Sequence, residues 1–335
     1  SFNTEIIYTS QRGNSKMKAI KAICILWITI FLGMYHAQPP IPEASGCDCD
    51  CMACSACDFE NACMTVTATS GDVLLDGIGN CVIVESAVTG EIRGTQTNDC
   101  ILIQGSGAVI NEINSRNGDD CIIVRDGATL EGRISGGNDN DCLRLTQVTT
   151  SDIVGGAGND DIIIEGITVN PRVVEKRADE QTPSSLNGQA GDDCIRVTPF
   201  DGVQPFMGNV LGGGDNDCID VQTSDVLTIS GGNGNDVMYA RCSVMVNMNG
   251  AAGNDVMIVE EVTIQPFSTI ANAVHGAGGD DRILVESLTQ NMGITNGRIN
   301  GFGDTDSCCS RADPADFDVV DCEDETCPPV VEITC

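Results

Sequence analysis

The sequence predicts an all-β protein folded as a parallel β-solenoid of roughly ten coils with cysteine-rich ends. Three observations predict this fold. A loop rich in glycine and aspartate recurs about every 20 residues between residues 71 and 307. Each loop is followed by a short run rich in Ile, Val and Leu, which is typical of β-strands. Aromatic residues make up only 4% of the chain, so a core of large aromatic side chains is not expected.

Residues 1–37 are expected to be upstream sequence and a signal peptide. Met17 opens a segment in which lysines precede an apolar run at residues 23–32, and Ala37 follows as a small residue for cleavage. The apolar run is too short for a comfortable membrane span. We therefore expect a secreted protein, extracellular or at the cell surface, with no membrane association after signal cleavage. An uncleaved anchor is the alternative.

Residues 38–70 combine a proline-rich linker with a cysteine-rich head. The head holds six cysteines: Cys47, Cys49, Cys51, Cys54, Cys57 and Cys63. In an exported protein such cysteines are expected to form disulfides, although the Cys-x-x-Cys spacings also suit a metal cluster. The partners of these cysteines do not follow from their spacing.

Residues 71–307 form the repeat array. Each unit contains a glycine- and aspartate-rich loop, a strand such as residues 121–125, a turn, and a second strand such as residues 128–134. One unit cannot bury its own apolar face, so the units are expected to stack as coils. The alternation within strands places Arg144 and Arg196 outward, and Asp220 takes the same place in its coil.

Two of the loops follow one consensus at every fixed position. Residues 231–239 and residues 155–163 both fit Gly-Gly-x-Gly-x-Asp-x-apolar-x. This pattern resembles the nonapeptide repeats of the RTX family, whose members form calcium-binding parallel β-rolls. The resemblance covers about 70% of the chain and implies calcium as the bound ion. Here one such loop occurs in each unit rather than two, so only one edge of the solenoid is expected to bind calcium.

The aspartates that end the loops are the candidate metal ligands. Stacked one coil apart, their charges would repel one another, and a calcium ion held by carboxylate and carbonyl oxygens would remove that cost. The alternative is that the aspartates cap turns through side-chain hydrogen bonds. The candidates include two neighbouring residues in one loop and are Asp99, Asp120, Asp141, Asp160, Asp161, Asp193, Asp217, Asp236, Asp255, Asp281 and Asp306.

Cysteine forms a second ladder beside the aspartates. It takes the same place in six units: Cys81, Cys100, Cys121, Cys142, Cys194 and Cys218. Stacked cysteines lie within the Cα separation that a disulfide needs. We therefore expect bonds between adjacent coils, namely Cys81–Cys100, Cys121–Cys142 and Cys194–Cys218, with buried free thiols as the alternative.

Residues 308–335 form an acidic, cysteine-rich tail. It is expected to cap the last coil, because an open solenoid end is an exposed edge strand. Addition of the last residues as a strand to a neighbouring subunit is the alternative.

The net charge and the lack of catalytic motifs limit the classes of function that we expect. The formal net charge of −32 disfavours nucleic acid and anionic lipid as partners. Carboxylates occur as a repeated ladder rather than as a singular pair, and His275 has no evident nucleophile partner, so no enzyme is expected. We expect a secreted, calcium-stabilised, disulfide-reinforced structural rod that self-associates end to end as a subunit of an extracellular filament, cell-surface appendage or matrix. The alternatives are a monomeric adhesin or carbohydrate-binding module with extracellular glycan or matrix partners, and then a polysaccharide-degrading solenoid enzyme.

Overall fold

A computed structural model describes most of the repeat array and the cysteine-rich head. The predicted signal peptide and much of the predicted tail lie outside the described residues. No helix within the described residues is long and apolar enough to cross a membrane. The described ranges are 47–67, 71–77, 80–150, 152–169, 185–264, 272–286, 288–290, 297–301, 306–310 and 317–320.

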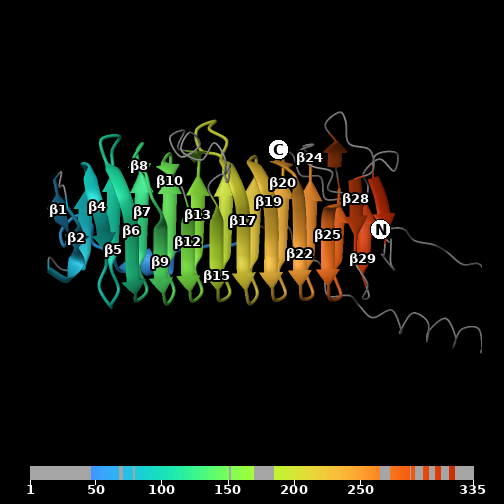
Figure 1. Cartoon of the computed structure of the whole chain (residues 1–335), viewed down its shortest axis with the longest axis horizontal. Helices are drawn as coiled ribbons and strands as arrows, with labels where there is room; N and C mark the ends of the chain where they lie inside the picture. The colour runs from blue at the N-terminus through green and yellow to red at the C-terminus, as the bar shows by residue number, and fades with distance from the viewer. Residues whose placement is uncertain are drawn as a thin grey trace, which may run out of the picture. The chain divides into compact units, whose positions relative to one another are not determined.

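The repeats fold as a parallel β-solenoid, as predicted. Successive strands lie side by side along one axis in chain order (Figure 1). The solenoid makes about nine turns, close to the roughly ten expected. Each turn contributes strands to two sheets, and the strand pairs between neighbouring turns are parallel and in register.

Sheet A has twelve parallel strands, of which the first, β1, comes from the end of the cysteine-rich head and pairs with β3. Six of its strands begin with cysteine, and the residue before them is a loop aspartate in five of these. Its strands are β1 (Met64–Val66), β3 (Cys81–Val84), β5 (Cys100–Gln104), β7 (Cys121–Arg125), β10 (Cys142–Thr146), β13 (Asp161–Glu165), β16 (Cys194–Thr198), β18 (Cys218–Gln222), β20 (Val237–Arg241), β23 (Val256–Glu260), β26 (Arg282–Val285) and β29 (Ser307–Ser310).

Sheet B holds the eighteen remaining strands and bends along each coil. The long strand β6 pairs with both β8 and β9 of the next coil, and β19 likewise pairs with both β21 and β22. Its strands are β2 (Val73–Leu74), β4 (Val88–Arg93), β6 (Val109–Asn117), β8 (Thr129–Leu130), β9 (Ile134–Asn138), β11 (Thr149–Thr150), β12 (Ile153–Ala157), β14 (Thr168–Val169), β15 (Leu186–Ala190), β17 (Phe206–Gly214), β19 (Asp225–Asn233), β21 (Val244–Met245), β22 (Asn247–Ala252), β24 (Val262–Ile264), β25 (Asn272–Gly278), β27 (Leu288–Gln290), β28 (Gly297–Asn300) and β30 (Phe317–Val320).

Alternation along the strands builds the core. In β7, Ile122 and Val124 are fully buried, and they stack in register on Leu143 and Leu145 of β10. Each buried aliphatic side chain of this kind contributes about 1.5–3 kcal/mol. The core is therefore a column of small aliphatic ladders, which explains why so few aromatic residues suffice.

The outward row of sheet A departs from the prediction at one position. Arg144 is exposed as expected, but Asp220 in the same row is only 1% exposed. Its carboxylate accepts a hydrogen bond from Gln222 Nε2 at 2.8 Å and lies 4.0 Å from Arg241 Nε. A buried ion pair and a hydrogen bond thus replace solvent around Asp220.

Candidate functional site

One ladder of aspartates runs along the turns that precede sheet A. Each member is the last residue before a sheet A strand, and each is 2% exposed or less. The predicted register is correct, and the side chains are buried inside the turns. The ladder consists of ten of the eleven candidate ligands: Asp99, Asp120, Asp141, Asp160, Asp193, Asp217, Asp236, Asp255, Asp281 and Asp306.

The aspartates bond to one another's backbone from coil to coil. The backbone N–H of Asp99 donates to Oδ1 of Asp120 at 2.7 Å, and eight further bonds of 2.8–2.9 Å repeat this step up to Asp306. Each carboxylate therefore satisfies an N–H group that the turn would otherwise bury unpaired. The turn-capping role, predicted as the alternative to calcium, is present in every one of these steps.

A second ladder, which the sequence analysis missed, lies one residue earlier in the same turns. Here the hydrogen bonds run the other way: Asp119 N–H donates to Oδ1 of Asn98 at 3.1 Å, and seven more bonds of 2.7–3.0 Å continue the series to Asp280. The signal was the Asn or Asp that stands directly before each ladder aspartate from Asp99 to Asp281. Two opposed hydrogen bonds therefore join each pair of neighbouring turns across this stretch.

The second oxygen of most ladder aspartates has no hydrogen-bond partner among the described residues. This holds for Oδ2 of every ladder member from Asp120 to Asp281, whereas Oδ2 of Asp99 accepts the Thr95 N–H at 2.6 Å. In most coils this oxygen packs against the glycine five residues earlier. A Cβ atom on Gly231 would lie 2.1 Å from Asp236 Oδ2, so no larger residue fits there without displacing the carboxylate.

Burial changes the protonation of these carboxylates. It raises the pKa of Asp120 to about 8, of Asp141 to about 9 and of Asp236 to about 6, against the opposing effect of the backbone hydrogen bond that each accepts. A buried carboxylate with one unpaired oxygen is costly when ionised. Each ladder aspartate therefore favours either a proton or a nearby cation.

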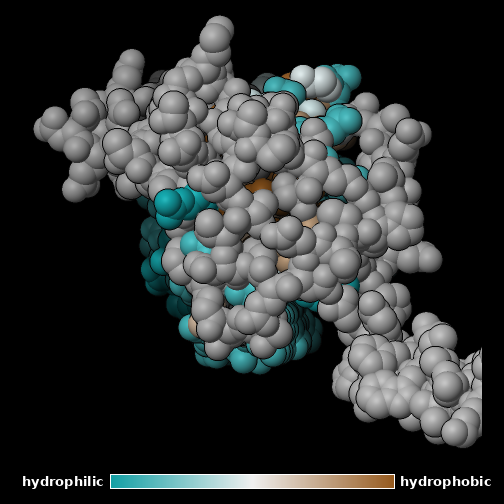
Figure 2. Space-filling model, turned by 90° about the vertical axis from the view of Figure 1, so that its right-hand side faces the viewer, coloured by the Kyte–Doolittle hydropathy of each residue, from teal (hydrophilic) through white to brown (hydrophobic). Residues whose placement is uncertain are grey.

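Carboxylate and carbonyl oxygens lie close together beside the glycines of these turns. The Cβ position of Gly212 lies 2.2 Å from Asp217 Oδ2 and 2.7 Å from the carbonyl oxygen of Gly231, so a carboxylate and a carbonyl oxygen face the same glycine. Carboxylate and carbonyl oxygens are the ligands that calcium prefers. Hydrophilic residues also gather along the lower edge of the described surface, where the regular turns lie (Figures 1 and 2).

The second feature is a strap formed by residues 47–63, which crosses the outer face of sheet A. Its cysteines bond in reverse order to the cysteines that begin six strands. The adjacent-coil disulfides predicted from the stacking are therefore wrong, as is the free-thiol alternative for these residues. The bonds are Cys47–Cys218, Cys49–Cys194, Cys51–Cys142, Cys54–Cys121, Cys57–Cys100 and Cys63–Cys81.

The geometry of the stacked cysteines explains the correction. Side chains at one register position project in the same direction from the sheet, toward a segment lying above it rather than toward one another. The strap matches this row because the 3-10 helix η1 (Met52–Ala56) repeats every three residues and presents Cys51, Cys54 and Cys57 on one face. Three residues of such a helix advance about 6 Å, near the roughly 4.8 Å between coils. The equal numbers of cysteines in head and ladder were the signal that could have revealed the pairing.

One coil under the strap has aspartate in place of cysteine. Asp161 stacks between Cys142 and Cys194, and its Oδ2 accepts the backbone N–H of Cys51 at 2.8 Å. Asp161 is thus a contact of the strap and not a member of the aspartate ladder, in which Asp160 takes that coil's place. Burial raises the pKa of Asp161 above its ordinary value, and the Cys51 N–H opposes this shift.

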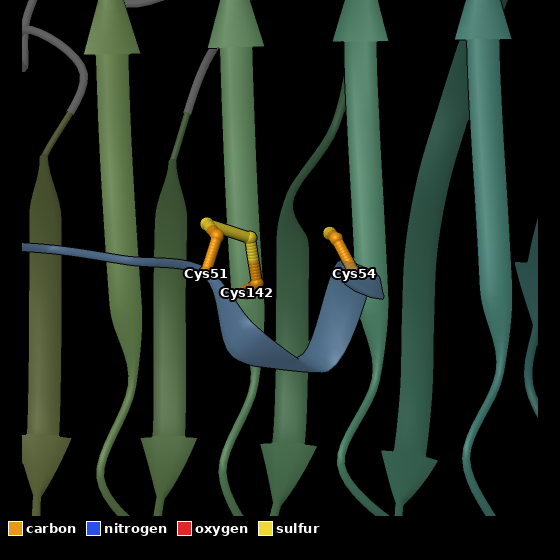
Figure 3. A group of neighbouring side chains, drawn as sticks. All are labelled: Cys51, Cys54 and Cys142. Atoms are coloured by element: carbon orange, nitrogen blue, oxygen red, sulfur yellow. A yellow bond between two sulfur atoms is a disulfide. The ribbon is translucent and has the colours of Figure 1, made fainter. Parts of the chain in front are cut away.

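The strap also accounts for the metal-like spacing of the head cysteines. The sulfurs of Cys51, Cys54 and Cys142 lie within 4.8 Å of one another, but Cys51 is bonded to Cys142 (Figure 3). Cys54 is bonded to Cys121. These sulfurs are disulfide sulfurs, as expected for an exported protein. Disulfides of this number are typical of an oxidising, extracellular environment.

Comparison with known proteins adds no relative. No family model, no curated protein and no solved structure matches this chain.

Proposed function

We propose that this protein is a secreted structural rod, stabilised by calcium and reinforced by disulfides, that serves as a subunit of an extracellular filament, cell-surface appendage or matrix. The observation that carries the proposal is the strap. Six disulfides join one short segment to six coils of the solenoid, from β3 to β18.

The strap supports a structural role because it opposes separation of the coils. Each disulfide restricts the unfolded chain, and loops of 18 to 171 residues correspond to about 3–5 kcal/mol for a single bond. Nested bonds contribute less than the sum of single bonds because each already restricts the next. Reinforcement along successive coils suits a protein that must keep its shape under load.

Calcium binding is the second part of the proposal, and it rests on the likeness of the loops to RTX repeats. The residues that would hold the ion are the ladder aspartates, through the Oδ2 atoms that lack a partner, together with loop carbonyl oxygens. Bound calcium would supply the positive charge that these buried carboxylates lack.

End-to-end self-association is the third part. Strand β1 pairs only with β3 among the described strands, so sheet A begins at an open edge. Met64 in β1 and Leu74 in β2 are 47% and 46% exposed at this end of the solenoid. An open edge with apolar side chains is a template for pairing with another chain, which supports stacking of a second copy.

The test is the assembly state of the secreted protein in calcium under oxidising conditions. We expect light scattering to show mass rising with concentration, and negative-stain imaging to show filaments. Met64→Lys at the open edge should reduce assembly, whereas Met52→Lys, at a 71% exposed position on the strap, should not. A protein that stays monomeric at high concentration would contradict the proposal.

A further inference from the structure

The strap disulfides are fully nested. Cys47–Cys218 encloses a span of 171 residues, and each further bond lies inside the one before it. The successive spans, from the outermost bond to the innermost, are 171, 145, 91, 67, 43 and 18 residues.

Nesting determines how tension passes through the molecule. A pull on the two ends of the chain reaches Cys47 along the backbone, crosses the disulfide to Cys218 and continues from there. Residues between these two cysteines lie on a closed loop and bear no tension while the bond is intact. We propose a mechanical function for the strap: it makes the coils that precede β18 a tension-shielded arm.

The coils after β18 lie outside the shielded arm, because their strands lack the strap cysteine. In β20, β23 and β26 the place of the strap cysteine is taken by Val237, Val256 and Arg282. No strap disulfide reaches these coils, and the disulfides of Cys242, Cys308 and Cys309 lie outside the strap. The inference depends on the disulfide connectivity alone and stands whether or not the protein forms filaments.

Reduction would release the shielded arm. A dithiol reductant gives two electrons and two protons to each disulfide, which becomes two thiols while the dithiol becomes a disulfide. Once all six bonds are reduced, the tension path gains the 171 residues of the outer loop. At up to about 3.5 Å per residue, this is a gain of about 600 Å in contour length.

Single-molecule stretching of the full secreted chain, held at its two ends, tests the proposal. In the oxidised protein the 171 residues should stay hidden, and a dithiol should release them. Because only the outermost remaining strap bond bears tension, the strap should release its residues in one order: 26, 54, 24, 24 and 25 residues, the differences between successive spans, and then the innermost loop. The disulfides of Cys242, Cys308 and Cys309 lie outside these spans, so their releases do not belong to this series. Where two bonds break in one observed step, the number of residues released should equal the sum of two consecutive values in this order. Release of the full length without reductant, or steps in another order, would overturn the proposal.

A matched pair of double variants gives an independent readout in the oxidised protein. Cys47→Ser with Cys218→Ser makes Cys49–Cys194 the outermost bond and should lengthen the stretched chain by 26 residues, about 90 Å. Cys63→Ser with Cys81→Ser removes the innermost bond and should leave the length unchanged. An unchanged length in the first variant, or a longer chain in the second, would contradict the assigned tension path.

Discussion

In most turns one glycine faces one carboxylate oxygen, and this contact shows why the loop consensus needs glycine there. The space that a Cβ would fill beside Gly188, Gly231 or Gly276 is taken by the Oδ2 atom of the aspartate five residues later. The requirement is steric. Ser115 is the exception, and its hydroxyl donates to the carbonyl oxygen of Gly136 in the next coil.

A substitution at this glycine should therefore be costly. Gly231→Ala places a methyl group 2.1 Å from Asp236 Oδ2, and we expect a loss of about 1–3 kcal/mol in the free energy of unfolding. Gly214→Ala is the matched control, because its nearest contact would be 3.6 Å away, at the Gln189 carbonyl oxygen. Urea unfolding of both variants measures the difference. Equal stability of the two variants would show that the glycine is not kept by this contact.

At the scale of the element, the turn combines two opposed hydrogen-bond ladders with a column of buried carboxylates. In the first ladder the N–H of each aspartate donates to the carboxylate of the aspartate in the next coil, as Asp217 does to Asp236. In the second ladder the N–H of the residue before the aspartate donates to the side chain of its counterpart in the preceding coil, as Asn235 does to Asn216. Together they fix the register of neighbouring turns, since a shift by one residue would break both. The unpaired Oδ2 atoms remain the costly part of this arrangement.

That cost predicts an unusual pH dependence for the metal-free protein. The folded pKa values of about 6 for Asp236 to about 9 for Asp141 lie above the ordinary value of 3.8, so the folded state binds protons that the unfolded state has released. This stabilisation is complete below the unfolded pKa and is lost as the pH rises through the folded values. After chelation we expect the melting temperature to fall between pH 5 and pH 9.

Calcium should reverse this trend, because it competes with protons for the same oxygens. We expect chelation to lower the melting temperature and the β signal in circular dichroism strongly at pH 8, and much less at pH 5. Thermal unfolding at both pH values, with and without calcium, measures the effect. The absence of any shift on chelation at pH 8 would rule out calcium as the stabilising ion.

The elements themselves could be predicted from the sequence to a large extent, and the reasons are local. The glycine- and aspartate-rich loops and the aliphatic runs follow a period that only stacked coils satisfy. The strands, the core column and the aspartate ladder could therefore all be predicted from the sequence. The burial of the ladder could not be predicted, because the sequence does not distinguish an aspartate that accepts a backbone N–H from one on the surface. Asp161 was assigned to the ladder for the same reason, since it stands next to Asp160 and only the register of β13 separates their roles.

At the scale of the whole molecule, the strap could not be predicted from the period because it joins segments far apart in the chain. The stacked cysteines were correctly aligned, but their partners depend on what lies above the sheet. The strap converts part of a one-dimensional stack, in which each coil contacts only its neighbours, into a unit cross-linked along its length. This feature supports the structural role most strongly.

The most direct test of the account is a disulfide map of the secreted protein, made by mass spectrometry of peptides digested without reduction. We expect six cross-linked pairs between the strap and sheet A, in which the order of the strap cysteines is the reverse of the order of their partners. Cys47 should be bonded to Cys218 and Cys63 to Cys81 at the two extremes. A map with Cys81 bonded to Cys100 and Cys121 to Cys142 would contradict the account, because the coils would then be joined only to their neighbours and no strap would exist.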